Sequence, residues 1–125
     1  MDVRLDRQGS GDTTLLTARG AGQELAGFRV DDQLRVRISK VDDRETTDLR
    51  VVSGRWYRVE LDLDVAAQTF IARVLDDDGR MLLERTLQPW RAPEVSVVDG
   101  LCVAASTGSS GLGMSFDDVR VTRIP

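Results

Sequence analysis

Three carboxylates stand two residues apart within the segment 54–65, which reads GRWYRVELDLDV. They belong to Glu60, Asp62 and Asp64, and in an extended strand they would share one face because successive side chains point to opposite faces. A retaining glycosidase uses two carboxylates about 5 to 5.5 Å apart as nucleophile and acid/base. The alternative interpretation is a solvated sheet face, and the clean alternation of apolar and charged residues favours it.

The residue types that are missing restrict the chemistry further. The chain contains no histidine, which excludes a Ser-His-Asp triad, a Cys-His pair and histidine-ligated zinc. Its single cysteine, Cys102, lies in an apolar run at 101–105. We therefore expect a buried, inert thiol and no intrachain disulfide.

Length, charge and hydropathy define the broad class. A chain of 125 residues can bury a core without disulfides or metal, so we treat 1–125 as a single domain. The net charge of −4, with arginines interleaved among acids, argues against a nucleic-acid partner. No apolar run approaches the roughly 20 residues that span a bilayer, so we expect no membrane partner. The N-terminus lacks a signal-peptide segment, which predicts either a cytoplasmic protein starting at Met1 or an extracellular domain excised from a larger secreted protein.

A period of two residues recurs along the chain and predicts an all-β fold. We expect strands over 3–7, 13–18, 25–30, 33–41, 46–52, 56–65, 69–75, 81–87, 95–98, 101–106 and 114–123. Turn signals separate them, such as DDDG at 76–79, where Gly79 would supply a positive φ. The segment 106–113 is expected to be a mobile hairpin loop. This spacing of short strands predicts an antiparallel β-sandwich or barrel.

Several of these segments together resemble the concanavalin A-like, laminin-G-like jelly-roll superfamily. The resemblance is carried by GRWYRV at 54–59, TFIARV at 69–74 and the closing FDDVRV at 116–121, and it extends from about Gln33 to the C-terminus. It implies a jelly-roll β-sandwich. It is specific for fold rather than function, because the superfamily includes lectins, lyases, glycosidases and accessory modules. The chain is short for such a domain, so its first strands are abbreviated or completed by another domain or subunit.

The order Glu-Leu-Asp-Leu-Asp at 60–64 is also similar to the Glu-x-Asp-x-Glu motif of family 16 glycoside hydrolases, which share a jelly-roll fold. In this chain the acid/base position is held by Asp64, one methylene shorter than the motif. Aromatic residues make up only 5% of the chain, too few for the aromatic-rich cleft of that family. Catalysis is therefore the less favoured interpretation.

The superfamily resemblance implies association with carbohydrate. Sugar binding needs exposed aromatic faces and planar polar groups that hydrogen-bond hydroxyls. Trp90 and its neighbour Arg91, in the proline-flanked loop 88–93, are candidate ligand-binding residues. The favoured alternative for Trp90 is that it folds back over a sandwich edge. Trp56 is the third candidate. In the alternation of this strand it falls on the same face as the charged residues, so it is either exposed or marks a register shift. The alternative is a structural role at the end of the sandwich.

Related modules frequently hold a structural calcium, for which Asp117 and Asp118 are the candidate ligands. Calcium needs roughly six to eight oxygen ligands, and the acid pairs at 31–32 and 42–43 would contribute. The alternative is a β-bulge, in which Phe116 and Val119 are both buried and the aspartates cap nearby N–H groups. No other cofactor is expected.

The sequence as a whole predicts a non-catalytic, carbohydrate-binding or accessory module of a bacterial polysaccharide-processing protein. Its partners would be a glycan or a neighbouring catalytic domain. One alternative is a purely structural module that packs on a neighbouring domain. The second is a glycoside hydrolase or lyase that uses Glu60 and Asp64.

Overall fold

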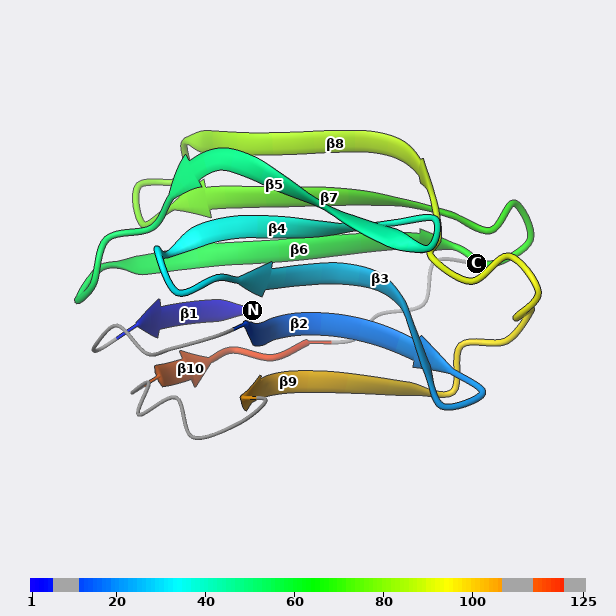
Figure 1. The fold of residues 1–125 in the computed structure, drawn as a ribbon. Coiled ribbons are helices and arrows are strands. Elements are labelled where there is room, and N and C mark those ends of the chain that lie inside the picture. The colour runs from blue at the N-terminus through cyan, green and yellow to red at the C-terminus, as the bar shows by residue number, and fades with distance from the viewer. Residues whose placement is uncertain (6–11, 107–113, 121–125) are drawn as a thin grey trace.

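The computed structural model describes residues 1–5, 12–106 and 114–120. These residues form ten strands (Figure 1): β1 (Asp2–Leu5), β2 (Thr13–Gly20), β3 (Gln23–Val30), β4 (Arg35–Lys40), β5 (Asp43–Arg50), β6 (Trp56–Asp64), β7 (Thr69–Asp76), β8 (Met81–Pro89), β9 (Gly100–Ser106) and β10 (Met114–Asp117). In the part described there is no helix that could cross a membrane. The mobile loop expected at 106–113 lies, after Ser106, outside the described residues.

The strands form two antiparallel sheets of five strands each. Sheet A has the order β10-β1-β6-β7-β8 and sheet B the order β5-β4-β3-β2-β9. Strands from the two ends of the chain pair in both sheets, β1 with β10 and β2 with β9. The strand axes of both sheets are roughly aligned across the view, with neighbouring strands antiparallel (Figure 1). The predicted all-β, antiparallel class is confirmed, and the arrangement is consistent with a β-sandwich.

Both sheets contribute to one apolar core. In β6, Tyr57 and Val59 are buried whereas Arg58 between them is exposed, as the alternation predicts. Phe70 on β7 joins them from sheet A, and Phe28 on β3 joins them from sheet B. Burying one such side chain stabilises the fold by about 1.5 to 3 kcal/mol. This inward set fixes which side chains of β6 face solvent.

The prediction of a strand at 95–98 is wrong, because this segment is an irregular connection between β8 and β9. The Val95 N–H donates to the Ala92 carbonyl (3.0 Å), and the Val95 carbonyl accepts from Nε2 of Gln68 (2.9 Å). The Val97 carbonyl lies so close to Gly20 that a Cβ there would come within 1.9 Å of it. The segment is thus held by close packing against the Gly20 backbone and by a hydrogen bond from the Gln68 side chain, and not by hydrogen bonds to a neighbouring strand. The other predicted strands are present within the described residues, with shifted ends.

The hairpin predicted at 76–79 is confirmed. Gly79 has a φ of 84°, and its N–H donates to the Asp76 carbonyl (3.1 Å). Oδ1 of Asp76 accepts from the N–H groups of Asp78 (3.0 Å) and Arg80 (2.8 Å). Because Asp76 is paired with Tyr57 in the register of β7 and β6, this turn lies beside the start of β6.

A buried carboxylate is held by cations on sheet B. Glu24 is almost fully buried and accepts from Arg29 Nε (2.9 Å), Ser39 Oγ (2.9 Å) and Arg44 Nε (3.2 Å). Burial alone would raise the pKa of Glu24, but these hydrogen bonds outweigh it and hold the pKa below its ordinary value. The carboxylate therefore stays charged and ties β3, β4 and β5 together.

A second ion pair joins the edges of the two sheets. Arg85 on β8 donates through Nε and Nη2 to the two carboxylate oxygens of Glu45 on β5, at 3.1 and 2.9 Å. The edge strands β8 and β5 therefore lie on the same side of the molecule. The hydrogen bonds from Arg85 hold the pKa of Glu45 below its ordinary value.

Replacing Glu24 by glutamine should lower the free energy of unfolding by about 3 kcal/mol near neutral pH, because two partly buried guanidinium groups lose their carboxylate. The pKa of Glu24 is lower in the folded chain than its ordinary 4.5. Its contribution is therefore present above that value and is lost as the pH falls below it. Urea unfolding measured at about pH 7 and about pH 3 should show a smaller acid-induced loss in Glu24→Gln than in the wild type.

The matched control is Glu84→Gln, which removes one carboxylate of an exposed pair with Arg73. It should cost less than about 1 kcal/mol. Equal losses for the two variants would contradict a stabilising role for the buried cluster.

Candidate functional site

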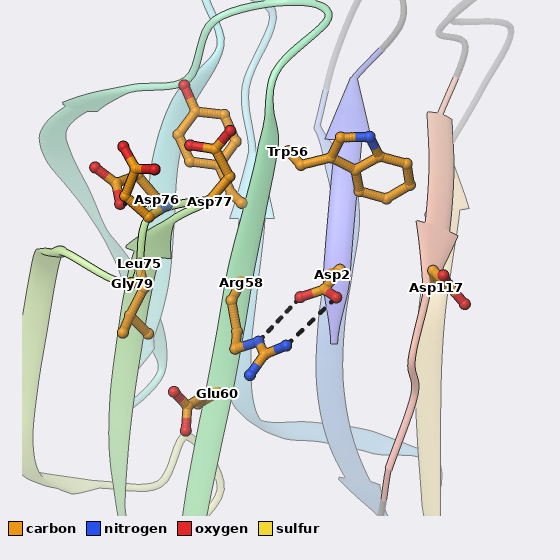
Figure 2. Close-up of a pocket in the computed structure, with 11 residues that line it drawn as sticks. Asp2, Trp56, Arg58, Glu60, Leu75, Asp76, Asp77, Gly79 and Asp117 are labelled. Atoms are coloured by element: carbon orange, nitrogen blue, oxygen red, sulfur yellow. Dashed lines mark hydrogen bonds and ion pairs between the residues drawn. The ribbon is translucent and has the colours of Figure 1, made fainter.

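An open pocket of about 550 Å³ lies on the outer face of sheet A, beside the turn between β7 and β8 (Figure 2). Its walls come from β1, β6, the end of β7 with the following turn, and β10. The outward-facing side chains of Trp56, Arg58 and Glu60 on β6 line it, because alternation directs Val59 into the core. Tyr57, which is largely buried, also lines the pocket. The pocket is thus a consequence of the alternation in β6 and of the position of the turn.

Trp56 is the aromatic wall of this pocket. It lies on the same face as Arg58, and β6 pairs with β1 without a register shift, Trp56 opposite Arg4. The Arg4 guanidinium carbon lies 5.1 Å from the centroid of the indole ring, a cation–π distance. Figure 2 shows the ring lying over β1. The expectation that Trp56 is on the charged face is confirmed, and the ring is half-buried.

Arg58 is the cation that lines the pocket. It donates through Nε to Oδ1 of Asp2 (3.0 Å) and through Nη2 to Oδ2 (3.5 Å), the two contacts dashed in Figure 2. It also lies 3.6 Å from the Asp118 carboxylate. The hydrogen bond to Asp2 raises the pKa of Arg58 above its ordinary value. Its charge is therefore permanent and is already balanced by protein carboxylates.

Four other carboxylates line the pocket and make no ion pair within the part of the chain described: Glu60, Asp77, Asp78 and Asp117. Glu60 projects from β6, and Asp77 and Asp78 belong to the β7–β8 turn. Ionised carboxylates accept hydrogen bonds and do not donate them. The pocket can therefore receive a ligand that offers donors and an apolar face.

Trp90 does not provide an exposed aromatic face. It is 1% exposed, and its backbone N–H donates to the Gln68 carbonyl (3.0 Å). The candidate role of Trp90 as an exposed aromatic is therefore wrong, and the favoured alternative, in which the ring folds back over the sandwich, agrees with its burial. Because Trp90 follows the end of β8, it lies at the opposite end of that strand from the β7–β8 turn and the pocket.

Arg91 serves the fold rather than a surface site. Its N–H donates to the Leu25 carbonyl (2.7 Å), and its carbonyl accepts from the Asp42 N–H (3.1 Å). The side chain is half-buried, and Nε has no hydrogen-bond partner among the described residues. These bonds attach the segment after β8 to sheet B, so Arg91 is not placed beside Trp56.

The carboxylate row of β6 lies on the outer face, as expected, but it does not form one site. Glu60 lines the large pocket, whereas Asp62 and Asp64 line a separate pocket of about 170 Å³. Asp62 is bound to Arg73 (2.7 Å), and Oδ1 of Asp64 accepts from the Ala67 N–H (3.0 Å). Neither of these two pockets is lined by both Glu60 and Asp64.

The aspartates proposed for calcium are used within the protein. Asp118 binds Arg120 (2.6 Å) in addition to its contact with Arg58, and Oδ1 of Asp117 accepts from the Asp118 N–H (2.7 Å). The acid pairs at 31–32 and 42–43 flank the two ends of β4, so they cannot meet at one point. The Asp31 carboxylate also accepts hydrogen bonds from the backbone N–H and from Nε of Arg35 (both 2.9 Å).

The alternative of a β-bulge between Phe116 and Val119 assumed that both side chains are buried, and this assumption is wrong. The two side chains are 51% and 44% exposed, so neither is buried. The strand instead ends at Asp117, and Asp118 takes a left-handed φ of 53°. Asp117 consequently faces the rim of the pocket.

The acidic turn and Asp2 are pocket residues that sequence reasoning missed. The turn was predicted only as a hairpin, although its run of three aspartates was a visible signal. The carboxylates of Asp76, Asp77 and Asp78 lie within 4.8 Å of one another. That of Asp76 accepts hydrogen bonds from N–H groups of the turn and forms an ion pair with Arg80 (3.3 Å). Cys102 is half-buried rather than buried because β9 is an edge strand.

Comparison of the chain with models of protein families, with curated proteins and with solved structures found no match. The function has to be inferred from the pocket itself.

Replacing Trp90 should affect stability and not the pocket. Trp90→Ala should lower the free energy of unfolding by about 3 to 5 kcal/mol because it empties a buried site. Trp90→Phe should cost about 1 to 2 kcal/mol, since it keeps a ring and removes an indole N–H that has no hydrogen-bond partner among the described residues. Chemical denaturation measures both. A Trp90→Ala variant as stable as the wild type would contradict the buried position.

Calcium should not stabilise the chain more than magnesium does, because Asp118 already binds two arginines. Thermal unfolding in millimolar calcium and in equal magnesium should give the same midpoint, in the wild type and in Asp118→Asn. A rise specific to calcium that disappears in Asp118→Asn would show that a metal site does form there.

Proposed function

We propose that this chain is a non-catalytic, carbohydrate-binding β-sandwich module in which the pocket around Trp56 receives a sugar. The observation that carries the proposal is the combination of the half-buried indole of Trp56 with several hydrogen-bond acceptors in one open pocket. Its volume of about 550 Å³ lies within the roughly 300 to 1,000 Å³ common for small-ligand sites.

The chemistry of the pocket suits a pyranose. The apolar C–H face of a sugar can lie against the indole of Trp56, while its hydroxyl groups donate to the carboxylates of Glu60 and Asp77. A carboxylate has two oxygens and can accept from two neighbouring hydroxyls, which gives orientation as well as attraction. The contact between Arg4 and Trp56 holds the ring in place, which reduces the entropy lost on binding.

The order of the strands supports the finer assignment to a concanavalin A-like, laminin-G-like jelly roll. Pairing of β1 with β10 and of β2 with β9 brings both ends of the chain together in each sheet, which suits a wrapped topology. By this proposal the module accompanies a polysaccharide-processing enzyme outside the cell and holds it on its substrate.

Binding is favoured over turnover because Glu60 and Asp64 line different pockets. A retaining or inverting glycosidase needs its two carboxyl groups on opposite sides of one glycosidic bond. Glu60 would in this proposal accept hydrogen bonds from a bound sugar.

Trp56→Ala should weaken glycan binding by roughly tenfold or more, as expected when a central aromatic contact is removed. The measurement is a glycan array to identify ligands, followed by calorimetric titration of the best oligosaccharide. The matched control is Arg55→Ala, which changes an exposed neighbour outside the pocket and should leave affinity unchanged.

Hydrolysis assays on the same polysaccharides separate the remaining possibilities. Binding without hydrolysis supports the proposal. Hydrolysis abolished by Glu60→Gln would replace it with an enzyme, and no binding to any glycan would leave a structural module that packs on a neighbouring domain.

A further inference from the structure

The charge of the pocket is strongly one-sided. Glu60, Asp77, Asp78 and Asp117 add to the charges of Asp2 and Asp76, and Arg58 is the cation among the lining residues. Arg4 lies over the indole of Trp56 and Arg80 is paired with Asp76, so the excess of negative charge lies at Glu60 and at the exposed turn residues Asp77 and Asp78. In a concave site of one sign the field is focused, which raises the local concentration of ligands of opposite charge. The pocket should therefore discriminate between sugars by charge as well as shape.

The pocket offers little to an anionic sugar. Arg58 is directed to the Asp2 carboxylate and lies near Asp118. A uronate or sulfated sugar would have to displace these contacts while facing Glu60 and the acidic turn. Like charges placed together cost several kcal/mol, so acidic glycans should be excluded.

The opposite holds for a protonated amine. Figure 2 shows Trp56 on the β1 side of Arg58 and the carboxylates of Asp76 and Asp77 on the β7 side. An ammonium group is attracted to the face of an indole and to carboxylates alike. Asp77 and Asp78 are exposed on the turn and make no ion pair among the described residues, so their charge is available to a ligand.

From this arrangement we infer that the Trp56 pocket selects glycans that carry free amino groups, such as oligosaccharides of deacetylated hexosamine, over their neutral and acidic counterparts. The inference rests on the proposed glycan-binding function and specifies its ligand class. Trp56 supplies the contact common to all sugars, and the acidic turn supplies the preference for the amine.

The test is calorimetric titration with three oligosaccharides of equal length, in a chelator and at low ionic strength, at about pH 6. They are a β-linked glucosamine oligomer, its fully N-acetylated form and a galacturonate oligomer. The amine form should bind at least about tenfold more tightly than the N-acetylated form, and galacturonate should not bind. Salt near 1 M should remove most of the preference because charge interactions are then screened.

A double variant isolates the source of the preference. Asp77→Asn with Asp78→Asn should weaken binding of the amine oligomer roughly fivefold or more and leave the N-acetylated oligomer unchanged. The matched control is Asp64→Asn, which removes one carboxylate of the same sheet face from the other pocket and should change neither. Both turn residues are exposed, and an unchanged unfolding midpoint verifies that the double variant is folded; otherwise Asp77→Asn alone is used.

The outcomes distinguish the inference from the function on which it rests. If the N-acetylated form binds as tightly as the amine form, the inference is overturned and glycan binding stands. If no oligosaccharide binds, both fail. If an oligolysine peptide binds as tightly as the amine oligomer and Trp56→Ala has no effect on either, the pocket attracts charge alone and the inference is again overturned.

Discussion

Burial of alternate side chains between the two sheets sets the arrangement of everything outside the core. Val59 and Phe70 must face inward to exclude water, and each commits its chain neighbours in β6 and β7 to the outer face of sheet A. A shift of one residue in β6 would bury Arg58 and expose Val59, at a cost far above any surface interaction. Burial of Val59 in the core therefore fixes the outward position of the pocket residues on β6.

Charges are treated differently on the two sheets. On sheet B, Glu24 is buried and fully matched by Arg29, Arg44 and Ser39, so its charge contributes to stability and not to recognition. On sheet A, the carboxylates that line the pocket beside Trp56 are exposed or half-buried and outnumber the cations that line it. Matched, buried charge marks a structural cluster, whereas unmatched, accessible charge beside an aromatic ring marks a surface available to ligands.

Local alternation was enough to predict the class of fold, nearly all strands and the outward face of Glu60. Alternation gave no signal for Trp90, which follows the end of β8, and its burial was favoured only because large aromatic side chains are usually buried. Alternation also failed at 95–98, where β-branched residues suggested a strand but close packing on Gly20 decided the backbone. The pocket was only partly predictable: Trp56 was found by parity, whereas the contribution of the β7–β8 turn depends on its pairing beside the start of β6.

The two tryptophans of the chain lie in contrasting surroundings: Trp90 is buried after the end of β8, and Trp56 lies in the wall of an open pocket. Indole fluorescence depends on exposure to water and to charged quenchers. Trp90 would report on loss of the folded state, and Trp56 on what enters the pocket. A cationic quencher such as caesium should reach Trp56 more readily than iodide does, so emission spectra alone can read out the sign of the local electric field.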